Sequence, residues 1–295
     1  MVRAGLRSLL FVPGDNAKLA AKALVSAADA VILDLEDAVV PDAKLKARDV
    51  VRETLDHADR GGKTVFVRIN AFDTDLSNGD LASIAGGKPD GIVLPKCGGV
   101  HELERLAYCL DVLEAREGLE PGAICTLPVA TETAAATLNL SIAHHRPPPR
   151  LWGAMWGSED LAAALGANAN RDGGGSYTFQ YQYARSQCLY AASALDIVAV
   201  DAVYSDFRDL EGLEREILDG LRDGFTAKAA IHPAQVEVIN NLLTPNPEQI
   251  DWARQVVSLL ADAGVARLDG KMIDMAHKRM AERILQRASL LTEAA

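Results

Sequence analysis

The sequence predicts an α/β protein built as a (β/α)8 TIM barrel, with an additional helical segment at its C-terminal end. Short apolar or β-branched runs recur along the chain, longer stretches with helical periodicity separate them, and eight such units fit into roughly 240 residues. An open doubly wound sheet is the alternative. It would usually carry a glycine-rich phosphate turn early, and the early candidate at residues 12–16 has a single glycine. The barrel is therefore favoured.

The predicted strands are nearly all apolar, as expected of parallel strands that are covered on both faces. The runs VILDL, GIVLP and LPVA show this composition. The eight strands are predicted at Ser8–Val12, Ala30–Leu35, Thr64–Ile69, Gly91–Leu94, Ile124–Ala130, Leu151–Trp156, Ile197–Val200 and Ala229–Ile231.

Amphipathic stretches between these strands predict the connecting helices. Two stretches interrupt the pattern: the proline-rich Arg146–Arg150 reads as a rigid connector, and the polar, glycine-rich Asn168–Ser176 as a mobile loop. The predicted helices are Ala17–Ala27, Ala43–Ala58, Val100–Glu117, Thr133–His145, Gln180–Ser193 and Leu210–Asp223, with the shorter Gly79–Ala85 in the same role.

Three more helices are predicted after the eighth strand, at Pro233–Leu243, Pro247–Ala263 and Asp269–Ala288. Closing a barrel does not require the last of them. We therefore expect a catalytic barrel domain over residues 1–243 and a C-terminal helical extension over residues 244–295. An extra terminal segment of this kind usually packs on the barrel or on a neighbouring subunit.

The composition excludes several classes of protein. The net charge of −11 argues against a general nucleic-acid-binding or anionic-membrane-binding protein, because both need a basic surface. We see no signal peptide and no apolar run long enough to span a membrane. The four cysteines form no CxxC pair, which suggests reduced thiols. We therefore expect a cytoplasmic protein.

Polar residues gather where the predicted strands end, and in a barrel this is where the active site lies. Carboxylates follow several different strands, with an arginine and a lysine among them. These strand-end residues are Asp34, Glu36, Asp37, Arg68, Asn70, Lys96, Glu132, Glu159, Asp160, Asp201 and His232.

Converging carboxylates repel one another unless a cation lies between them, and Mg²⁺ prefers oxygen ligands of this kind. Glu132 and Asp160, at the ends of adjacent strands, suit the role of metal ligands. The alternative is that they cap the helical runs that follow Thr131–Glu132 and Ser158–Glu159. The pattern of residues leaves both interpretations open.

Two cationic side chains at the same strand ends suit the binding of a carboxylated substrate. Arg68 can grip a carboxylate bidentately, although a structural salt bridge to Asp34 or Asp37 is equally compatible with its position. Lys96 can polarise a carbonyl or pair with a carboxylate, whereas a Schiff-base lysine would need a desolvated site. A single strand-end histidine, His232, is weak evidence for any role.

These motifs, in this order, resemble those of the citrate lyase β-subunit-like proteins of the HpcH/HpaI aldolase superfamily. The resemblance extends from about residue 5 to residue 285. The motifs are RSLLFVPG from Arg7, DLEDAV from Asp34, VRIN up to Asn70, LPK up to Lys96, TET around Glu132, GSEDLAAALG from Gly157, and KAAIHPAQ from Lys228.

The resemblance implies a Mg²⁺-dependent lyase that cleaves or forms acyl-CoA thioesters such as malyl-CoA, citramalyl-CoA or citryl-CoA. It implies that Glu132 and Asp160 hold the metal and that Arg68 grips the substrate carboxylate. Backbone amides near Gly157, Ser158 and Glu159 are implied to help seat that carboxylate. Arg7, Asp34, Asp37 and Lys96 are further candidate site residues.

In the malyl-CoA and citramalyl-CoA lyase branches, an aspartate of a C-terminal GxMID motif acts in proton transfer. Gly270–Asp274 matches this motif, so the resemblance implies that role for Asp274. The C-terminal segment of those branches reaches over a neighbouring subunit's site, and we expect a homo-oligomer, a trimer or a hexamer. On local sequence alone, Asp274 is equally an N-cap of the last helix.

The chemistry of the residues agrees with this implied activity. Cleavage of a 3-hydroxyacyl thioester needs a Lewis acid for the hydroxyl and carboxylate oxygens, a cationic clamp, and a group that handles the proton of the thioester enolate. The substrates would be a small acyl-CoA and a 2-oxo acid, namely glyoxylate, pyruvate or oxaloacetate. Malyl and citramalyl groups differ by one methyl, so the sequence does not choose between them.

Three alternatives remain. A metal-dependent class II pyruvate aldolase of the same superfamily would rely on an early histidine, and none precedes His57. A partner-dependent citrate lyase β-type subunit would need an acyl-carrier partner, and would not need the GKMID tail. A generic phosphate-binding barrel would carry a glycine-rich loop after the seventh or eighth strand, which the sequence lacks.

Overall fold

The computed structural model describes residues 2, 5–138 and 148–293 of the chain. The chain divides into two compact units, Met1–Ile239 and Asn240–Ala295, and each is described by itself. Within the described residues, no helix is long and apolar enough to cross a membrane.

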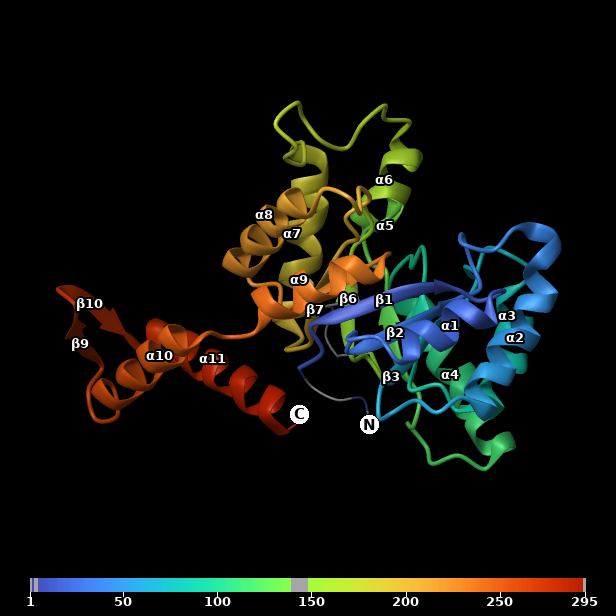
Figure 1. The fold of residues 1–295 in the computed structure, drawn as a ribbon, viewed down its shortest axis with the longest axis horizontal. Helices are drawn as coiled ribbons and strands as arrows, with labels where there is room; N and C mark the ends of the chain where they lie inside the picture. Colours follow the sequence, from blue (N-terminus) through green and yellow to red (C-terminus); the bar gives the residue numbers. More distant parts are fainter. Residues whose placement is uncertain (1, 3–4, 139–147, 294–295) are drawn as a thin grey trace. The chain divides into compact units, whose positions relative to one another are not determined.

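The first unit contains eight parallel strands surrounded by helices (Figure 1). The hydrogen-bonded order is β5-β4-β3-β2-β1-β8-β7-β6. Parallel bridges Thr126–Leu151 and Val129–Met155 join β5 to β6 and close the barrel. The strands are β1 (Ser8–Pro13), β2 (Ala30–Asp34), β3 (Thr64–Arg68), β4 (Gly91–Leu94), β5 (Cys125–Pro128), β6 (Gly153–Met155), β7 (Val198–Asp201) and β8 (Ala227–Ala230).

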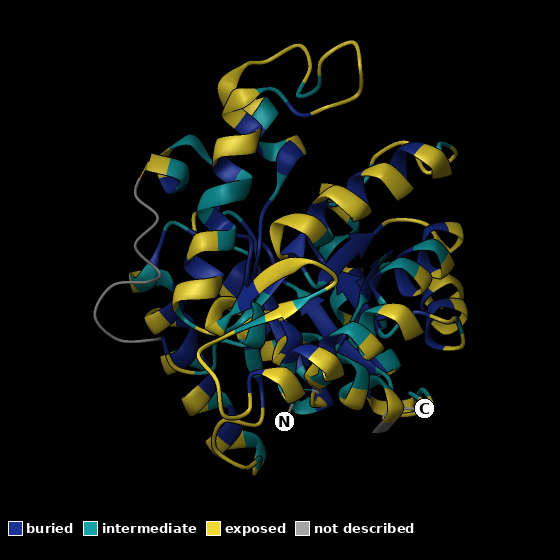
Figure 2. Ribbon diagram, turned by 90° about the vertical axis from the view of Figure 1, so that its left-hand side faces the viewer, coloured by how far each residue is buried: buried dark blue, intermediate teal, exposed yellow. Residues whose placement is uncertain are grey.

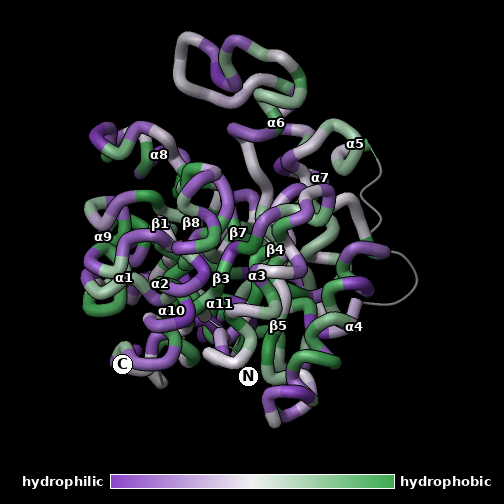
Figure 3. The backbone as a smooth tube through the Cα atoms, turned by 90° about the vertical axis from the view of Figure 1, so that its right-hand side faces the viewer, coloured by the Kyte–Doolittle hydropathy of each residue, from purple (hydrophilic) through white to green (hydrophobic). Residues whose placement is uncertain are grey.

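This arrangement confirms the predicted barrel, and all eight predicted strands are present. Inside it, apolar side chains from every strand form one core, which includes Leu9, Ile32 and Phe66. Figure 2 shows the strands as buried and the outer faces of the helices as exposed, and Figure 3 shows the hydrophobic strands at the centre. The core holds the strand ends in place and thereby positions the side chains that follow them.

Helices connect the strands as expected, and α4, α8 and α9 have the predicted bounds. Residues 133–138 of the predicted helix Thr133–His145 are described, with a helix over Ala134–Leu138, and residues 139–147 lie outside the described part. The proline-rich connector is likewise described only from Pro148 onward, and Asn168–Ser176 is a loop. The helices are α1 (Ala17–Leu24), α2 (Lys44–His57), α3 (Ser77–Ile84), α4 (Val100–Glu117), α5 (Ala134–Leu138), α6 (Ser158–Leu165), α7 (Phe179–Ala194), α8 (Leu210–Asp223) and α9 (Pro233–Leu243), with short 3-10 turns η1 (Pro41–Ala43) and η2 (Ala85–Gly87).

The second unit contains α10 (Pro247–Leu259), the antiparallel hairpin of β9 (Val265–Leu268) and β10 (Lys271–Asp274), and α11 (Met275–Glu293). A capping box at Asn246 begins α10. The two helices and the hairpin share a small apolar core of Ala253, Val256, Leu260, Ile273 and Ala281.

The prediction of a helix over Asp269–Ala288 is wrong at its start. Residues 269–274 belong to the hairpin, and the helix begins at Met275. Asp269 and Gly270 have φ values of 48° and 77°, the left-handed backbone of a tight two-residue turn, for which Asp-Gly is a preferred pair. The turn chemistry of this dipeptide therefore prevails over the helical periodicity around it.

Candidate active site

A cavity of about 220 Å³ opens at the C-terminal ends of the barrel strands. Part of its lining is apolar, and we call this part the apolar wall; the rest is polar and includes five carboxylates that follow β2, β5 and β6. The apolar lining is Phe11, Val129, Met155, Ala202, Val203 and Ile231, and the polar lining includes Asp34, Asp37, Arg68, Glu132, Ser158, Glu159 and Asp160.

The register of the parallel strands places Arg68 beside Asp34, because β2 and β3 end at the same level. Arg68 donates from Nε and Nη2 to the two Asp34 oxygens at 2.7 and 2.6 Å, and its third nitrogen, Nη1, lies 3.1 Å from Glu36 Oε2. Burial opposes ionisation, but Arg68 holds the pKa of the Asp34 carboxyl below its usual value. The salt bridge considered for Arg68 therefore exists, and binding of a substrate carboxylate stays a prediction.

Glu132 is buried at the end of β5, with 2% of its surface exposed. Burial and then the charge of Asp160 raise its pKa to about 8, although the Lys96 backbone N–H donates to the carboxylate. Gly157 leaves room for the Glu132 side chain, because a Cβ atom at Gly157 would lie 2.7 Å from Glu132 Oε2. The glycine of the GSED motif therefore permits the close packing of the two strand ends.

Lys96 bridges several of the carboxylates. Its Nζ donates to Glu36 Oε1 and lies 3.0 Å from Asp160 Oδ1 and 3.4 Å from Asp37 Oδ2. Glu36 is buried and central to these contacts; the sequence places it among the strand-end residues but assigns it no role. Its place in the DLEDAV motif, two residues after the end of a strand, is the signal that could have identified it.

Asp160 lies in the first turn of α6, where its side chain is partly exposed to the cavity. Ser158 is buried and receives a 3.3 Å hydrogen bond from the Tyr177 hydroxyl. Glu159 is exposed and accepts a hydrogen bond from Asn170 at 2.9 Å, so it points away from the carboxylate group. The first N–H groups of a helix have no intrahelical partners, which leaves those after Gly157 available for an anion.

Two predicted residues are not part of this carboxylate group. Arg7 precedes β1, at the opposite end of that strand, and pairs with Asp29 at 2.8 Å. Asp274 belongs to the second unit, where its Oδ1 accepts from the backbone N–H of Ala276 at 3.0 Å and lies 2.7 Å from His277 Nδ1. Asp274 thus caps α11, and the role implied for it in proton transfer stays a prediction.

The donor set fits Mg²⁺. Mg²⁺ usually takes one or two protein carboxylates and completes its shell with water and substrate oxygens. Among the described residues there is no cluster of three or more histidine, cysteine, aspartate or glutamate side chains that could hold a metal. Glu132 and Asp160 supply two carboxylates whose mutual repulsion raises the pKa of Glu132, and a divalent cation between them would remove that repulsion.

A second group of buried charges lies around the end of β7 and the start of β8. Lys228 donates to Glu216 at 2.8 Å and lies 3.5 Å from Asp201. Asp201 also accepts from Arg185 and from Trp156 Nε1. Asp201 therefore belongs to a salt-bridge network and not to the carboxylate group at the cavity. His232 stacks on Phe207 with ring centroids 4.6 Å apart.

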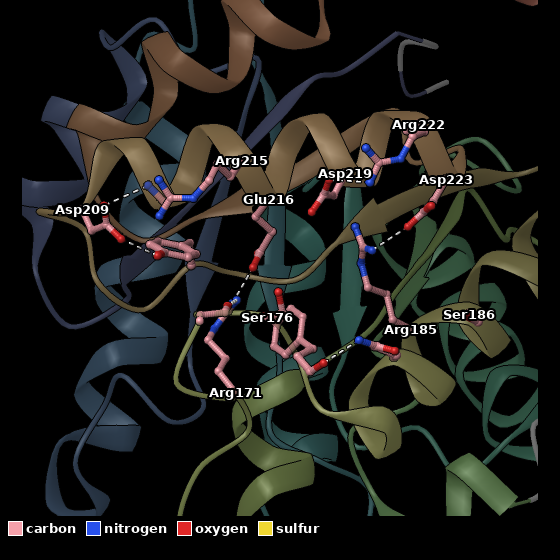
Figure 4. A pocket seen from close by; sticks show the side chains of 16 residues that line it. Arg171, Ser176, Arg185, Ser186, Asp209, Arg215, Glu216, Asp219, Arg222 and Asp223 are labelled. Carbon is pink, nitrogen blue, oxygen red and sulfur yellow. Dashed lines mark hydrogen bonds and ion pairs between the residues drawn. The ribbon is translucent and has the colours of Figure 1, made fainter.

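This network borders a larger, polar cavity of about 440 Å³ between α7, α8 and the loop at residues 171–177 (Figure 4). Four arginines and four carboxylates line it. Arg171 pairs with Glu216, Arg185 with Asp223, and Arg222 with Asp219. Figure 4 shows Arg215 beside Asp209. Because its charges balance in pairs, this cavity has no excess negative charge to attract a divalent cation, and we place the candidate active site in the smaller cavity.

The chain is similar to known proteins. The sequence profile described as HpcH/HpaI aldolase/citrate lyase matches residues 7–233. The chain is 37% identical to a (3S)-malyl-CoA thioesterase of Cereibacter sphaeroides over 97% of this chain and 95% of that protein. It is 32% identical to the mitochondrial citramalyl-CoA lyase of Rattus norvegicus, over 97% and 87% respectively.

A solved structure is similar over nearly the whole chain. It is the protein CitE from Mycobacterium tuberculosis in complex with magnesium, acetoacetate and coenzyme A. The TM-score is 0.81 at 34% sequence identity, and the match covers 98% of this chain and 100% of that one. A second structure of CitE from the same organism contains magnesium and pyruvate, with a TM-score of 0.74 at 32% identity over 97% and 100% of the two chains.

Proposed function

This chain belongs to the HpcH/HpaI aldolase/citrate lyase family, and we propose that it is a Mg²⁺-dependent carbon–carbon lyase of 3-hydroxyacyl-CoA thioesters. The substrate would be of the malyl-CoA, citramalyl-CoA or citryl-CoA type, with glyoxylate, pyruvate or oxaloacetate as the acid partner. The convergence of Glu132 and Asp160 beside Arg68, in a cavity with one apolar wall, carries the proposal.

Glu132 and Asp160 would hold the metal. Bound Mg²⁺ supplies a Lewis acid for the hydroxyl and carboxylate oxygens of the substrate. Glu132 is buried, so little water screens its charge. A bound cation therefore stabilises its ionised carboxylate more than it would stabilise an exposed one. The magnesium in the related CitE structures supports this assignment.

Arg68 would orient the oxo-acid carboxylate, and its partner Asp34 would hold the guanidinium in place. Asp34 accepts hydrogen bonds from Nε and Nη2 of Arg68, which fixes the orientation of the guanidinium. The third nitrogen, Nη1, faces Glu36. The backbone amides after Gly157 would bind the same carboxylate or the developing enolate charge. The apolar wall, with Phe11 and Met155, would exclude water from the reacting carbon atoms.

Asp274 would transfer the proton of the thioester enolate. If it does, Asp274→Asn keeps Mg²⁺ and substrate binding but loses kcat by about a hundredfold, the pattern of a group that acts in the transition state. Asp269→Asn is the matched control, because Asn tolerates the left-handed backbone of the same hairpin turn. Wild-type turnover in Asp274→Asn would contradict this role.

A thioesterase is the second candidate, because the relatives include both a malyl-CoA thioesterase and a citramalyl-CoA lyase. The two activities give different products from one substrate. A lyase releases a 2-oxo acid and a shorter acyl-CoA with its thioester intact, whereas a thioesterase releases a hydroxy acid and free CoA thiol. The cationic clamp and the apolar wall favour the lyase, since hydrolysis needs water at the thioester.

The test is to incubate the purified chain with Mg²⁺ and malyl-CoA, citramalyl-CoA or citryl-CoA, and to measure oxo acid and free thiol in the same sample. We expect oxo acid without an equal amount of thiol for at least one substrate. Thiol release without oxo acid would favour the thioesterase. Turnover only with an acyl-carrier protein would indicate a citrate lyase β-type subunit, and turnover of free hydroxy-keto acids alone would indicate a class II aldolase.

A further inference from the structure

We propose that Lys96 is a positioning residue whose ammonium holds the carboxylates of the metal site together and competes with the divalent cation for Asp160. This inference rests on the proposed function, because it assumes that Glu132 and Asp160 are the metal ligands. It adds a residue that tunes how tightly the site binds its metal.

Lys96 contacts four carboxylates at the proposed metal site. Its ammonium contacts Glu36, Asp160 and Asp37, and its backbone N–H donates to Glu132. A single residue thus joins groups that follow β2, β5 and β6. Glu36 also pairs with Arg68, whereas among the described residues the ion pairs of Asp37 and Asp160 are with Lys96.

The backbone at Lys96 is what allows both contacts at once. Lys96 has a φ of 51°, a left-handed conformation that is uncommon for residues other than glycine. This turn after β4 directs the N–H toward Glu132. A residue held in such a conformation costs free energy, so its persistence beside a functional cavity indicates a functional constraint.

The ammonium carries its charge throughout the physiological range. Burial lowers the pKa of Lys96, but the hydrogen bond and charge of Glu36 and the charge of Asp160 outweigh burial and raise the pKa above its usual value. A divalent cation that binds Asp160 therefore meets a fixed positive charge 3.0 Å from the Asp160 oxygen. With Glu36 and Asp37 as its other partners, the ammonium can release Asp160 and stay bound.

The charge inventory shows why this competition matters. Five carboxylates, Asp34, Glu36, Asp37, Glu132 and Asp160, lie near two cations, Arg68 and Lys96. Removal of the Lys96 charge makes the site more negative by one unit. Coulomb attraction for a divalent cation then increases, while the metal-free protein loses the contact that offsets repulsion between buried carboxylates.

The test compares Mg²⁺ binding by isothermal titration calorimetry in wild type, Lys96→Met and Lys96→Arg, with thermal unfolding of each protein in EDTA and in Mg²⁺. Lys44→Met is the matched control, because within the described part of the chain its Nζ donates to the Leu35 and Glu36 carbonyl oxygens and the Asn70 side-chain oxygen and pairs with no carboxylate. Glu132→Gln serves as the control for the metal site itself.

We expect Lys96→Met to bind Mg²⁺ about tenfold more tightly than wild type. In EDTA we also expect Lys96→Met to unfold at a lower temperature than wild type. Addition of Mg²⁺ should raise its melting temperature by more than it raises that of wild type. Lys96→Arg should stay within about threefold of wild type because it keeps the charge, and Lys44→Met within about twofold. If the role of Lys96 were purely structural, removal of its ammonium in Lys96→Met would instead weaken Mg²⁺ binding.

Unchanged or weaker Mg²⁺ binding in Lys96→Met would overturn the inference. An equal gain of affinity in Lys44→Met would also overturn it, because the effect would then come from net charge alone. If wild type binds Mg²⁺ through Glu132 and only the Lys96 result fails, the proposed function survives. If Glu132→Gln binds Mg²⁺ as well as wild type does, the proposed metal site fails and the inference fails with it.

Discussion

The barrel carries two groups of buried charge that differ in their balance. At the ends of β2 to β6, five carboxylates meet two cations, Arg68 and Lys96. Around the end of β7 and the start of β8, three carboxylates meet three cations in continuous ion pairs. The second group comprises Asp201, Glu216, Asp223, Arg171, Arg185 and Lys228.

The pKa values follow this difference. In the first group, burial and the neighbouring charge of Asp160 raise the pKa of Glu132 to about 8. In the second, burial also opposes ionisation of Asp201, but Lys228 and Arg185 lower its pKa well below the usual range. Both carboxylates are almost fully buried, so the supply of cations decides the outcome. The unbalanced group is suited to bind a metal, and the balanced group to hold the fold.

The largest effect is expected from substitutions in the unbalanced group, that is, the five carboxylates near Arg68 and Lys96. We expect Glu132→Gln or Asp160→Asn to lower Mg²⁺-stimulated cleavage of the acyl-CoA substrate by about a thousandfold or more, because removal of a ligand removes the Lewis acid. Each variant should keep the wild-type circular dichroism spectrum. EDTA should have the same effect on wild type. Full activity of the wild type in EDTA would contradict the assignment.

A change in the balanced group should affect stability instead. Lys228→Met leaves Asp201 and Glu216 buried with one cation fewer, and breaking a buried ion pair costs about 3 kcal/mol of unfolding free energy. Denaturant unfolding measures this loss. Mg²⁺ affinity of the folded variant should equal that of wild type, and an altered affinity would show that the two groups are not independent.

The pH dependence of stability sharpens the comparison. Glu132 has a pKa of about 8 in the folded protein and an ordinary value of 4.5 when unfolded. The unfolded chain therefore loses this proton first, and stability decreases as the pH rises from about 5 to 8, by about 3 kcal/mol. The control is Glu132→Gln, whose amide does not titrate. In EDTA, a constant difference in melting temperature between the two proteins over this range would contradict the raised pKa.

The smallest expected effect concerns substrate binding. Arg68→Lys replaces a bidentate fork with a point charge, and we expect the KM for the oxo acid in the condensation direction to rise about tenfold. Arg48→Lys is the matched control, since Arg48 pairs with buried Asp80 outside the cavity. An unchanged KM in Arg68→Lys, or an equal rise in Arg48→Lys, would count against the clamp.

Much of the barrel could be predicted because its signals are local. Apolar runs between amphipathic stretches identified all eight strands, and Gly91–Leu94 and Leu210–Asp223 have the predicted bounds. The start of the last helix could not be placed by periodicity, because the backbone of Asp269 and Gly270 decides it. That dipeptide is a recognised turn signal, so this error was avoidable.

The site was predictable to the extent that strand ends define it. The rule that barrel sites lie at the C-terminal strand ends brought Asp34, Arg68, Glu132 and Asp160 together. It did not reveal that Lys96 links Glu36 to Asp160, because that contact depends on a left-handed backbone and on the reach of a long side chain. Motif membership alone is also a weak guide, as Arg7 at the far end of β1 shows.

The most direct measurement is anomalous diffraction from crystals of the protein soaked in Mn²⁺, which shares the oxygen-rich octahedral preference of Mg²⁺. The unbalanced group predicts a strong anomalous peak within about 2–2.5 Å of carboxylate oxygens of both Glu132 and Asp160. It also predicts that this peak is absent in Glu132→Gln. A peak among Asp201, Glu216 and Asp223, or none at Glu132 and Asp160 in saturating Mn²⁺, would contradict the account.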